Sequence, residues 1–336
     1  MGFLLLMVLG IGLALAFNFF DAEPEDDGSG GDGEGDALPE PEGDVVPVDQ
    51  IVTIDSTTTE LETGAGNDVV SVDPTLANLD SLLVNTGAGN DVVDVTFDVP
   101  NAAVTGSTFE LGDGDDTFEG DLVVWDSVIN GGAGDDRIEV GSMLSTGEVN
   151  GGAGDDEITG SFGEFHGDEG NDTVTLTASN VEATGQWGTA YGDAGNDTLR
   201  YTGNLSEIGT VFDLGGAPAL HGGEGTDAFE IDLQVGEAST DPAVPPTHEF
   251  ESVVLADFEA GVETLQVDTS DYADAGYVFS DARLETDTDG ETRLFMTFDH
   301  DSEEAQEVQL SFGLAAASWS DITFTGASPA AFFPAA

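Results

Sequence analysis

The chain has 336 residues and a formal net charge of −65, with four arginines and no lysine. This balance excludes nucleic acids and anionic membrane surfaces as partners, because proteins bind phosphate groups through lysine and arginine. The absence of cysteine excludes disulfides, thiol nucleophiles and cysteine-ligated zinc. Because the many carboxylates repel one another, metal cations are their natural counter-charge.

Residues 1–20 form the only long apolar run and are expected to be a membrane anchor or a signal peptide. The basic n-region of a signal peptide is missing, which favours an uncleaved anchor, but Ala14-Leu15-Ala16 fits a cleavage site and leaves cleavage open. Either alternative places the rest of the chain outside the cytoplasm, secreted or at the cell surface. Residues 21–44 are acidic, rich in glycine and proline and free of aromatic residues, which predicts a disordered linker.

Residues 45–246 contain an internal repeat with the pattern x-Gly-x-Gly-(Asn/Asp)-Asp-x-apolar, whose positions are numbered one to eight below. The best copies span 131–138 and 151–158, and the others begin at Thr63, Thr86, Leu111, Gly167, Gly192 and Gly222. Aspartate replaces the glycine of position two at Asp168 and Asp193. Thr226 departs from the pattern at position five, so the last of the eight copies is the weakest match.

Apolar residues flank the copies at intervals that are typical of short strands. Those just before the copies are Val84, Phe109, Ile129, Val149, Phe165, Tyr191 and Leu220. Alternating pairs follow at Val70 and Val72, Val93 and Val95, Ile138 and Val140, Val174 and Leu176, and Phe229 and Ile231. A two-residue period indicates strands with one buried face. We therefore predict an all-β fold, a right-handed parallel β-solenoid or β-roll with one glycine-rich turn per coil stacked along one edge. The longest interval, before Gly222, is where stacking is expected to be weakest.

The turn chemistry points to calcium. Glycine permits positive φ and close backbone approach, so carbonyl oxygens can face into the turn, and aspartate at position six adds a hard anionic oxygen. Calcium accepts about six to eight such oxygens in flexible geometry. Stacking at a strand spacing of about 4.8 Å brings the oxygens of two turns together. A solenoid with plain polar turns would explain the glycines, but not an aspartate at position six of all eight copies.

The segments GGAGDDRIE, GGAGDDEIT, GAGNDVV and GDAGNDTL resemble the GGxGxDx(apolar)x nonapeptide of repeats-in-toxin (RTX) proteins. The resemblance implies a calcium-bound β-roll that is disordered without calcium and folds after export. It assigns carboxylate ligands at Asp68, Asp91, Asp116, Asp136, Asp156, Asp172, Asp197 and Asp227. It assigns carbonyl ligands at Gly64, Gly66, Gly87, Gly89, Gly112, Gly114, Gly131, Gly132, Gly134, Gly151, Gly152, Gly154, Gly167, Gly170, Gly192, Gly195, Gly222, Gly223 and Gly225. Family repeats often follow one another directly, whereas these are singly spaced, so one edge is expected to hold at most seven ions between eight turns.

Residues 247–336 are not repetitive. Residues 251–267 resemble the DFxxGxDxL segment that often follows such repeats in type I secretion substrates, which leaves the export route open beside an apolar N-terminus. Strand signals on both sides of Asp289-Gly290 predict a hairpin. An EF-hand is disfavoured, because Glu285 and Met296 stand at its first and last loop positions. We predict a small β cap that covers the open edge of the solenoid.

The sequence therefore predicts a calcium-binding, non-enzymatic exported protein with a structural or adhesive role, whose candidate partners are cell-surface glycans or matrix. The alternative is a polysaccharide lyase, epimerase or hydrolase on a calcium-stabilised β-helix. Arg137 and Arg200 are the only basic residues of the repeat region, and the alternation directs both outward, so we interpret them as surface residues. Trp125 and Trp187 are candidates for stacking on sugar rings, although tryptophans in strands more often pack.

Overall fold

A computed structural model describes residues 48–99, 102–144, 147–177, 188–203, 218–235, 253–301, 305–313 and 317–326. The expected anchor at 1–20, the expected linker at 21–44 and Trp187 lie outside the described residues. Within these ranges, none of the helices has the length and apolarity that a membrane crossing requires.

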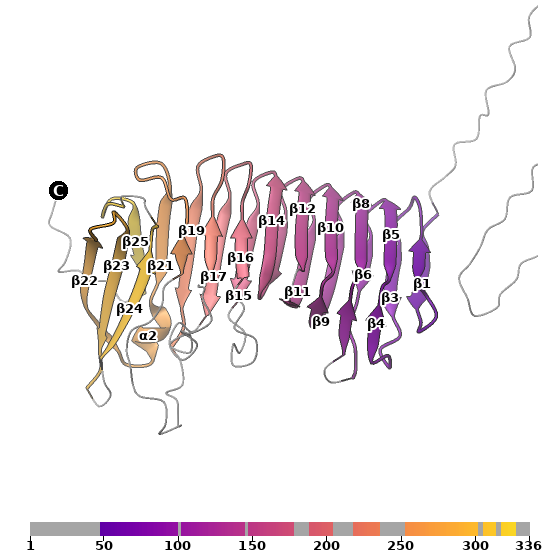
Figure 1. Cartoon of the computed structure of the whole chain (residues 1–336), viewed down its shortest axis with the longest axis horizontal. Coiled ribbons are helices and arrows are strands. Elements are labelled where there is room, and N and C mark those ends of the chain that lie inside the picture. The colour runs from indigo at the N-terminus through magenta and orange to yellow at the C-terminus, as the bar shows by residue number, and fades with distance from the viewer. Residues whose placement is uncertain are drawn as a thin grey trace, which may run out of the picture.

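The strands before and after each glycine-rich turn belong to two different sheets, so each repeat contributes strands to both sheets (Figure 1). The first sheet contains, in order, β1 (Ile51–Ile54), β3 (Val69–Val72), β6 (Val92–Asp94), β9 (Thr117–Trp125), β11 (Arg137–Leu144), β13 (Glu157–Gly160), β15 (Thr173–Thr177), β17 (Thr198–Gly203), β19 (Ala228–Leu233), β21 (Thr264–Asp268) and β25 (Ile322–Thr325), with β4 (Asn78–Asp80) and β7 (Ala103–Thr105) beside them. The second contains β2 (Glu60–Glu62), β5 (Leu83–Ala88), β8 (Thr108–Asp113), β10 (Val128–Ala133), β12 (Glu148–Ala153), β14 (Gly163–Glu169), β16 (Gly188–Tyr191), β18 (Ala219–His221), β20 (Val254–Leu255), β24 (Gln306–Ser311), β23 (Thr292–Asp299) and β22 (Val278–Thr286). Neighbouring repeat strands pair in parallel, which confirms the parallel all-β prediction and is compatible with a solenoid.

The core lies between the two sheets and is built from the predicted alternation. The buried residues of the second sheet, two before each turn, are Val84, Phe109, Ile129, Val149, Phe165, Ala190 and Leu220. Those at position eight, on the first sheet, are Val70, Val93, Phe118, Ile138, Ile158, Val174, Leu199 and Phe229. One residue of the prediction was wrong: Ala190 points inward, so Tyr191 points outward and stacks between the rings of His166 and His221. Burying apolar surface from both sheets stabilises the stack.

The glycine-rich turns stack along one long edge of the molecule (Figure 1). Gly132 lies opposite Gly152 and Arg137 opposite Glu157, so consecutive turns are in register. The 30-residue interval before the last copy does not disturb this register, because the Asp197 N–H still donates to Asp227 Oδ1 at 2.9 Å. The predicted weak point is therefore absent among the described turns, and the extra residues stand between β17 and β18 in the sequence.

The C-terminal region continues both sheets before it closes them. β20 pairs with β18, and β21 with β19, so parallel pairing extends beyond the last repeat. β22 and β23 then form the predicted antiparallel hairpin, which pairs through β23 with β24. The helix α2 (Ser270–Asp274) places the buried Tyr272 against Phe298 of β23, with ring centroids 4.2 Å apart. This region adds strands to the C-terminal end of both sheets (Figure 1).

Candidate metal centre

The eight aspartates of position six form a column along the turn edge, called the aspartate column below. None is more than 2 % exposed. In the last seven, Oδ1 accepts the backbone N–H of the aspartate in the preceding turn at 2.7–2.9 Å, and in the first, Asp68, Oδ1 accepts the Gln50 N–H at 2.6 Å. Asp136, for example, donates its N–H to Asp156 Oδ1 at 2.7 Å. The carboxylates are thus fixed one above another by the backbone of their neighbours.

The second carboxylate oxygen, Oδ2, is different. In all eight aspartates it is buried and has no hydrogen-bond partner in the described part of the chain. A buried carboxylate oxygen without a donor is costly unless a cation or a proton neutralises it. The four arginines pair elsewhere: Arg137 with Glu139 and Glu157, Arg200 with Glu230, Arg283 with Glu285 and Glu307, and Arg293 with Asp287 and Glu291. Since the chain has no lysine, the positive partner of the column must come from outside it.

Glycine at position one leaves a small space that Oδ2 faces. A β-carbon placed on Gly131 would lie 2.4 Å from Asp136 Oδ2 and 2.4 Å from the carbonyl oxygen of Gly151 in the next turn. The same holds at Gly151, where a β-carbon would lie 2.4 Å from Asp156 Oδ2 and 2.8 Å from the Gly167 carbonyl oxygen. The carboxylate of one turn and the carbonyl of the next therefore converge on one point, and both are oxygens, as calcium requires.

The carbonyl oxygens that the resemblance assigned are not equivalent. Those of position one face the space beside Oδ2, as at Gly151 and Gly222. Those of position two accept hydrogen bonds from the next turn, as when the Ala88 N–H donates to the Gly64 carbonyl at 2.8 Å. The glycines of positions two and four do have positive φ, +118° at Gly132 and +133° at Gly134. The geometry thus favours position one as the source of carbonyl ligands.

Aspartate at position two keeps the same backbone shape. Asp168 and Asp193 have φ of 71° and 67°, the left-handed conformation that glycine otherwise supplies. Their carbonyls accept N–H groups from the next turn, as in the other copies. The substitution at position two therefore leaves the turn intact.

A second ladder runs outside the aspartate column, at position five. The Asn or Asp Oδ1 of each turn accepts the N–H of position five in the next turn, as from Asp155 to Asp135 at 2.9 Å and from Asn196 to Asn171 at 3.0 Å. Thr226 donates its N–H to Asn196 in the same way, at 3.1 Å, so the last copy is stacked despite its departure from the pattern. The sequence analysis gave position five no role. Its preference for Asn or Asp, which the repeat itself displays, is the signal for this ladder.

Burial raises the pKa of five column carboxyls in the middle of the stack. The pKa of Asp136 and Asp172 rises to about 7, and that of Asp116, Asp156 and Asp197 to about 6. The main cause is desolvation. The N–H bond to Oδ1 opposes the rise, and the charges of neighbouring aspartates add to it. A cation beside these carboxylates would lower their pKa and favour the ionised form near neutral pH.

Two further residues belong to the column, and the sequence analysis missed both. Ile51 pairs with Val69, and Thr264 pairs with Ala228, so Gln50 and Glu263 stand in the row of position six at the two ends. Gln50 donates its N–H to Asp68 Oδ1 at 2.6 Å, and Glu263 is only 3 % exposed. The signal for Glu263 was the run 261–265, which keeps the Gly, acidic and apolar residues of positions four, six and eight.

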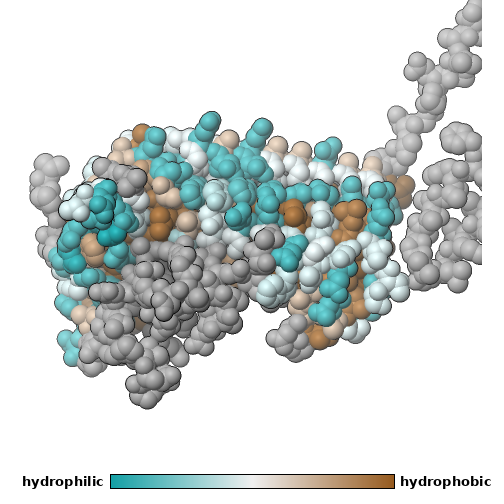
Figure 2. Space-filling model, viewed as in Figure 1, coloured by the Kyte–Doolittle hydropathy of each residue, from teal (hydrophilic) through white to brown (hydrophobic). Residues whose placement is uncertain are grey.

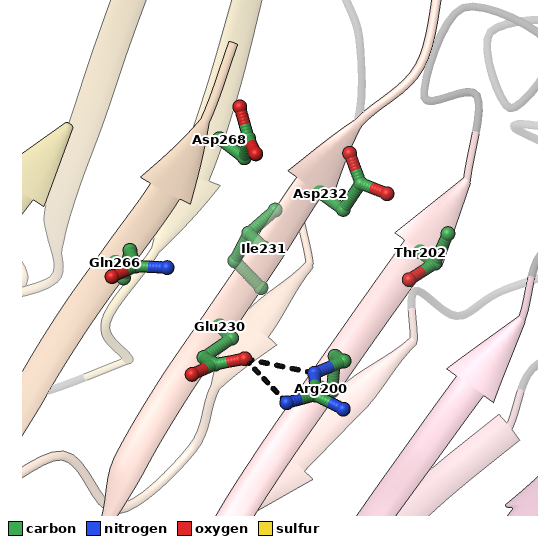
Figure 3. Close-up of a pocket in the computed structure, with 7 residues that line it drawn as sticks. All are labelled: Arg200, Thr202, Glu230, Ile231, Asp232, Gln266 and Asp268. Atoms are coloured by element: carbon green, nitrogen blue, oxygen red, sulfur yellow. Dashed lines mark hydrogen bonds and ion pairs between the residues drawn. The ribbon is translucent and has the colours of Figure 1, made fainter. Parts of the chain in front are cut away.

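A separate hollow of about 200 Å³ lies on the outer face of β17, β19 and β21 (Figure 3). The Arg200 guanidinium binds the Glu230 carboxylate there at 2.7 and 2.8 Å, while Asp232 and Asp268 lie on neighbouring strands. Burial, followed by the charges of Asp268 and Asp271, raises the pKa of Asp232. Hydrophilic residues cover much of the described surface in Figure 2. This hollow is the place to look for the alternative enzymatic activity.

Clusters of three or more His, Cys, Asp or Glu side chains suited to a metal are absent from the described ranges. The arrangement of the column explains this, because the space beside each Oδ2 is lined by carboxylates of adjacent turns and otherwise by backbone oxygens.

No family model matches the chain, and no curated protein shows significant similarity to it.

Proposed function

We propose that this chain binds a row of calcium ions along the aspartate column, as a right-handed β-roll of the RTX type. The observation that carries the proposal is the stack of eight buried aspartates, each with one oxygen held by the backbone and one without a donor. The carboxylates of Asp68, Asp91, Asp116, Asp136, Asp156, Asp172, Asp197 and Asp227 would hold the ions, together with carbonyl oxygens of position one. Bound calcium supplies positive charge to the column and carries no chemistry of its own.

Calcium fits these donors better than other common metal ions. The ligands are carboxylate and carbonyl oxygens, which hard cations prefer, and the turns contribute neither thiolate nor imidazole to the column. Magnesium demands near-octahedral geometry and usually retains several waters. The column instead offers buried oxygens from two turns to one small space, with adaptable backbone between them.

We further propose that calcium controls folding and thereby location. In the folded chain the column carboxylates stack at short range within a molecule of net charge −65, which opposes the compact state. Folding would therefore follow export into a calcium-rich medium, which agrees with the apolar segment at 1–20. We propose a non-enzymatic structural or adhesive role at the cell surface or outside the cell, with surface glycans or matrix as partners.

Calcium removal tests this proposal directly. We expect circular dichroism to show coil in chelator and strand in about 10 mM calcium, with magnesium at the same concentration restoring little of the strand signal. At an affinity of about 0.1–1 mM, each site adds roughly 1.4–2.7 kcal/mol at that concentration. Several sites together then match the whole stability of an ordinary domain, about 5–15 kcal/mol. A strand spectrum that chelator leaves unchanged would defeat the proposal.

The hollow beside Arg200 keeps the enzymatic alternative open. It gathers one arginine and three carboxylates, Glu230, Asp232 and Asp268, on a solenoid face. The pairing of Arg200 with Glu230 neutralises the one basic group, which favours the non-enzymatic proposal. Depolymerisation of an acidic or neutral polysaccharide that is lost in Arg200→Gln would favour the alternative, whereas glycan binding without turnover would favour an adhesive role.

A further inference from the structure

The two ends of the aspartate column carry different residues. We propose that the row of cations continues one step past the last repeat, to a terminal site shared by Asp227 and Glu263, and that Gln50 closes the opposite end. This inference rests on the proposed function, because it assigns the ends of the same row. It places one metal ligand outside the repeats, in a residue that no copy of the motif contains.

The C-terminal end is built like the interior of the column. The Thr264 N–H donates to the Asp227 carbonyl at 3.2 Å, and Thr264 pairs with Ala228, so Glu263 follows Asp227 in the stack. Glu263 is 3 % exposed, and its Oε2 accepts the Glu259 N–H at 2.6 Å. Asp227 is 2 % exposed, and its Oδ2, like that of the other seven aspartates, has no hydrogen-bond partner among the described residues.

The two buried carboxyl groups also act on each other. The carboxyl group of Glu263 is in contact with that of Asp227, and the charge of Asp257 lies nearby. Two carboxylates in contact repel unless a proton or a cation lies between them. All four arginines are engaged elsewhere, so the chain supplies no cationic side chain to this end.

Asp257 holds the terminal segment in place. Its two carboxylate oxygens accept the N–H groups of Gly222 and Gly223, at 2.9 and 3.0 Å. Both N–H groups belong to the last glycine-rich turn, so the segment leading to Glu263 lies on that turn where another repeat would lie. Since both oxygens of Asp257 already accept backbone donors, we assign it a positioning role and leave the ligand role to Glu263.

The N-terminal end shows what a neutral residue does in the same row. Gln50 donates its Nε2–H to the carbonyl oxygen of Thr63, the position-one carbonyl of the next turn. In later turns this is the carbonyl that faces the unpartnered Oδ2 of an aspartate. The amide of Gln50 thus supplies a donor to this carbonyl, as the Thr63 and Thr86 hydroxyl groups do for the position-one carbonyls of the next two turns, and the interval between Gln50 and Asp68 needs no ion.

Counting calcium ions tests the inference. We expect Glu263→Gln to bind one ion fewer per chain than the unchanged protein, measured by equilibrium dialysis of the full chain with metal analysis. The amide of the variant still accepts the Glu259 N–H, and Glu263→Asp, which keeps the charge, should retain the ion. Glu157→Gln is the matched control, because it removes the same charge from an exposed residue of position seven and should leave the count unchanged.

The outcomes separate the two proposals. If the unchanged protein binds no calcium, the proposed function fails. If it binds calcium and Glu263→Gln binds the same number with the same affinity, this inference fails and the proposed function stands. Should Glu263→Gln not fold, hydrogen exchange in the unchanged protein decides. Amides of Thr264 and Leu265 that gain protection with calcium support the terminal site, and amides indifferent to calcium, while the repeats respond, overturn it.

Discussion

Each column aspartate uses its two oxygens differently. Oδ1 is a structural acceptor for the turn before it, and Oδ2 is left for a ligand. Substitution by asparagine can keep the first role, because its carbonyl oxygen still accepts the backbone N–H. It removes the charge and puts an amide N–H₂ where Oδ2 was. Asparagine therefore separates the structural role from the ligand role at a single residue.

Asp136→Asn is expected to weaken calcium binding and to lower the melting temperature in calcium. Loss of one site lowers the free energy of unfolding by about 1.4–2.7 kcal/mol in about 10 mM calcium. Adjacent sites should also bind calcium more weakly, because each coil is stabilised by contacts with its neighbours. Isothermal titration and calcium-dependent melting measure both effects. Glu157→Gln, exposed one residue beyond Asp156, should change neither. Equal behaviour of the two variants would mean that calcium is only a diffuse counter-ion to the charged chain.

The structure changes one detail of this expectation. The sequence placed Asp227 in the last and weakest copy, where its loss would cost least. In the folded chain Asp227 is buried between Asp197 and Glu263; its Oδ2 has no hydrogen-bond partner among the described residues, as in the other seven, and its carboxyl group contacts that of Glu263. We therefore expect Asp227→Asn to cost as much as Asp136→Asn in the same melting experiment.

Glycine at position one should be required for affinity rather than for the fold. Gly151→Ala puts a β-carbon 2.4 Å from Asp156 Oδ2, so we expect weaker calcium binding at that turn. The fold tolerates a β-carbon there, since Thr63, Thr86 and Leu111 occupy position one of the first three copies. Gly152→Ala is the contrast: its φ of +113° strains the backbone with and without calcium. Titration and melting of both variants distinguish the two effects. A Gly151→Ala variant that binds calcium normally would contradict this account of the space beside Oδ2.

Protonation of the column carboxyls at acidic pH should partly replace calcium in stabilising the folded state. Five column carboxyls, those of Asp116, Asp136, Asp156, Asp172 and Asp197, have folded pKa values of about 6 to 7, above the value of about 3.9 expected in the unfolded chain. The folded state therefore binds more protons between these values. This contribution to stability is complete below about pH 4 and is lost as the pH rises through 6 to 7. In chelator we expect more strand signal at pH 5 than at pH 8, and calcium affinity should fall on acidification.

The control for this pH effect lies within the column. A chain with Asp136→Asn and Asp172→Asn lacks the two carboxyls with the highest pKa, so its strand signal in chelator should depend less on pH. If the strand signal of both chains depends equally on pH, the pH effect comes from reduced repulsion between surface carboxylates and not from protonation of the column.

At the scale of strands and turns, the sequence predicted those elements that are specified by residues close together in the chain. The two-residue period located strands on both sides of every turn, and the Asp289-Gly290 signal located the β22–β23 hairpin. The one misplaced side chain, Tyr191, came from choosing the nearest apolar residue and ignoring strict alternation. Ala190 is small but stands two residues before the turn, the same place as Val149 and Phe165.

The ends of the column could not be predicted in this way. Gln50 and Glu263 enter it through strand register, which depends on pairing between segments far apart along the chain. Neither residue belongs to a full copy of the motif, so a search for the motif passes over both. The position-five ladder was missed for a related reason, because its hydrogen bonds join residues 16 to 30 positions apart.

At the scale of the whole molecule, the stack is a one-dimensional array. Each coil contacts only the coils beside it, and the two side-chain ladders run in opposite senses. In the aspartate column a turn donates to the next turn, and at position five it donates to the previous one. An interior turn therefore has all its partners only when both neighbours are present. Such an array is expected to gain or lose order as a unit when its cations are added or removed.

The intervals between column aspartates range from 16 to 30 residues, yet the N–H bonds that join them stay within 2.7–2.9 Å. The turns of the aspartate column are thus constantly spaced, whereas the segments that connect one turn to the next differ in length. A chain of this kind could lengthen or exchange its return segments without disturbing the stacked turns. The aspartate column therefore keeps a constant spacing at which return segments of different sequence can be presented to solvent.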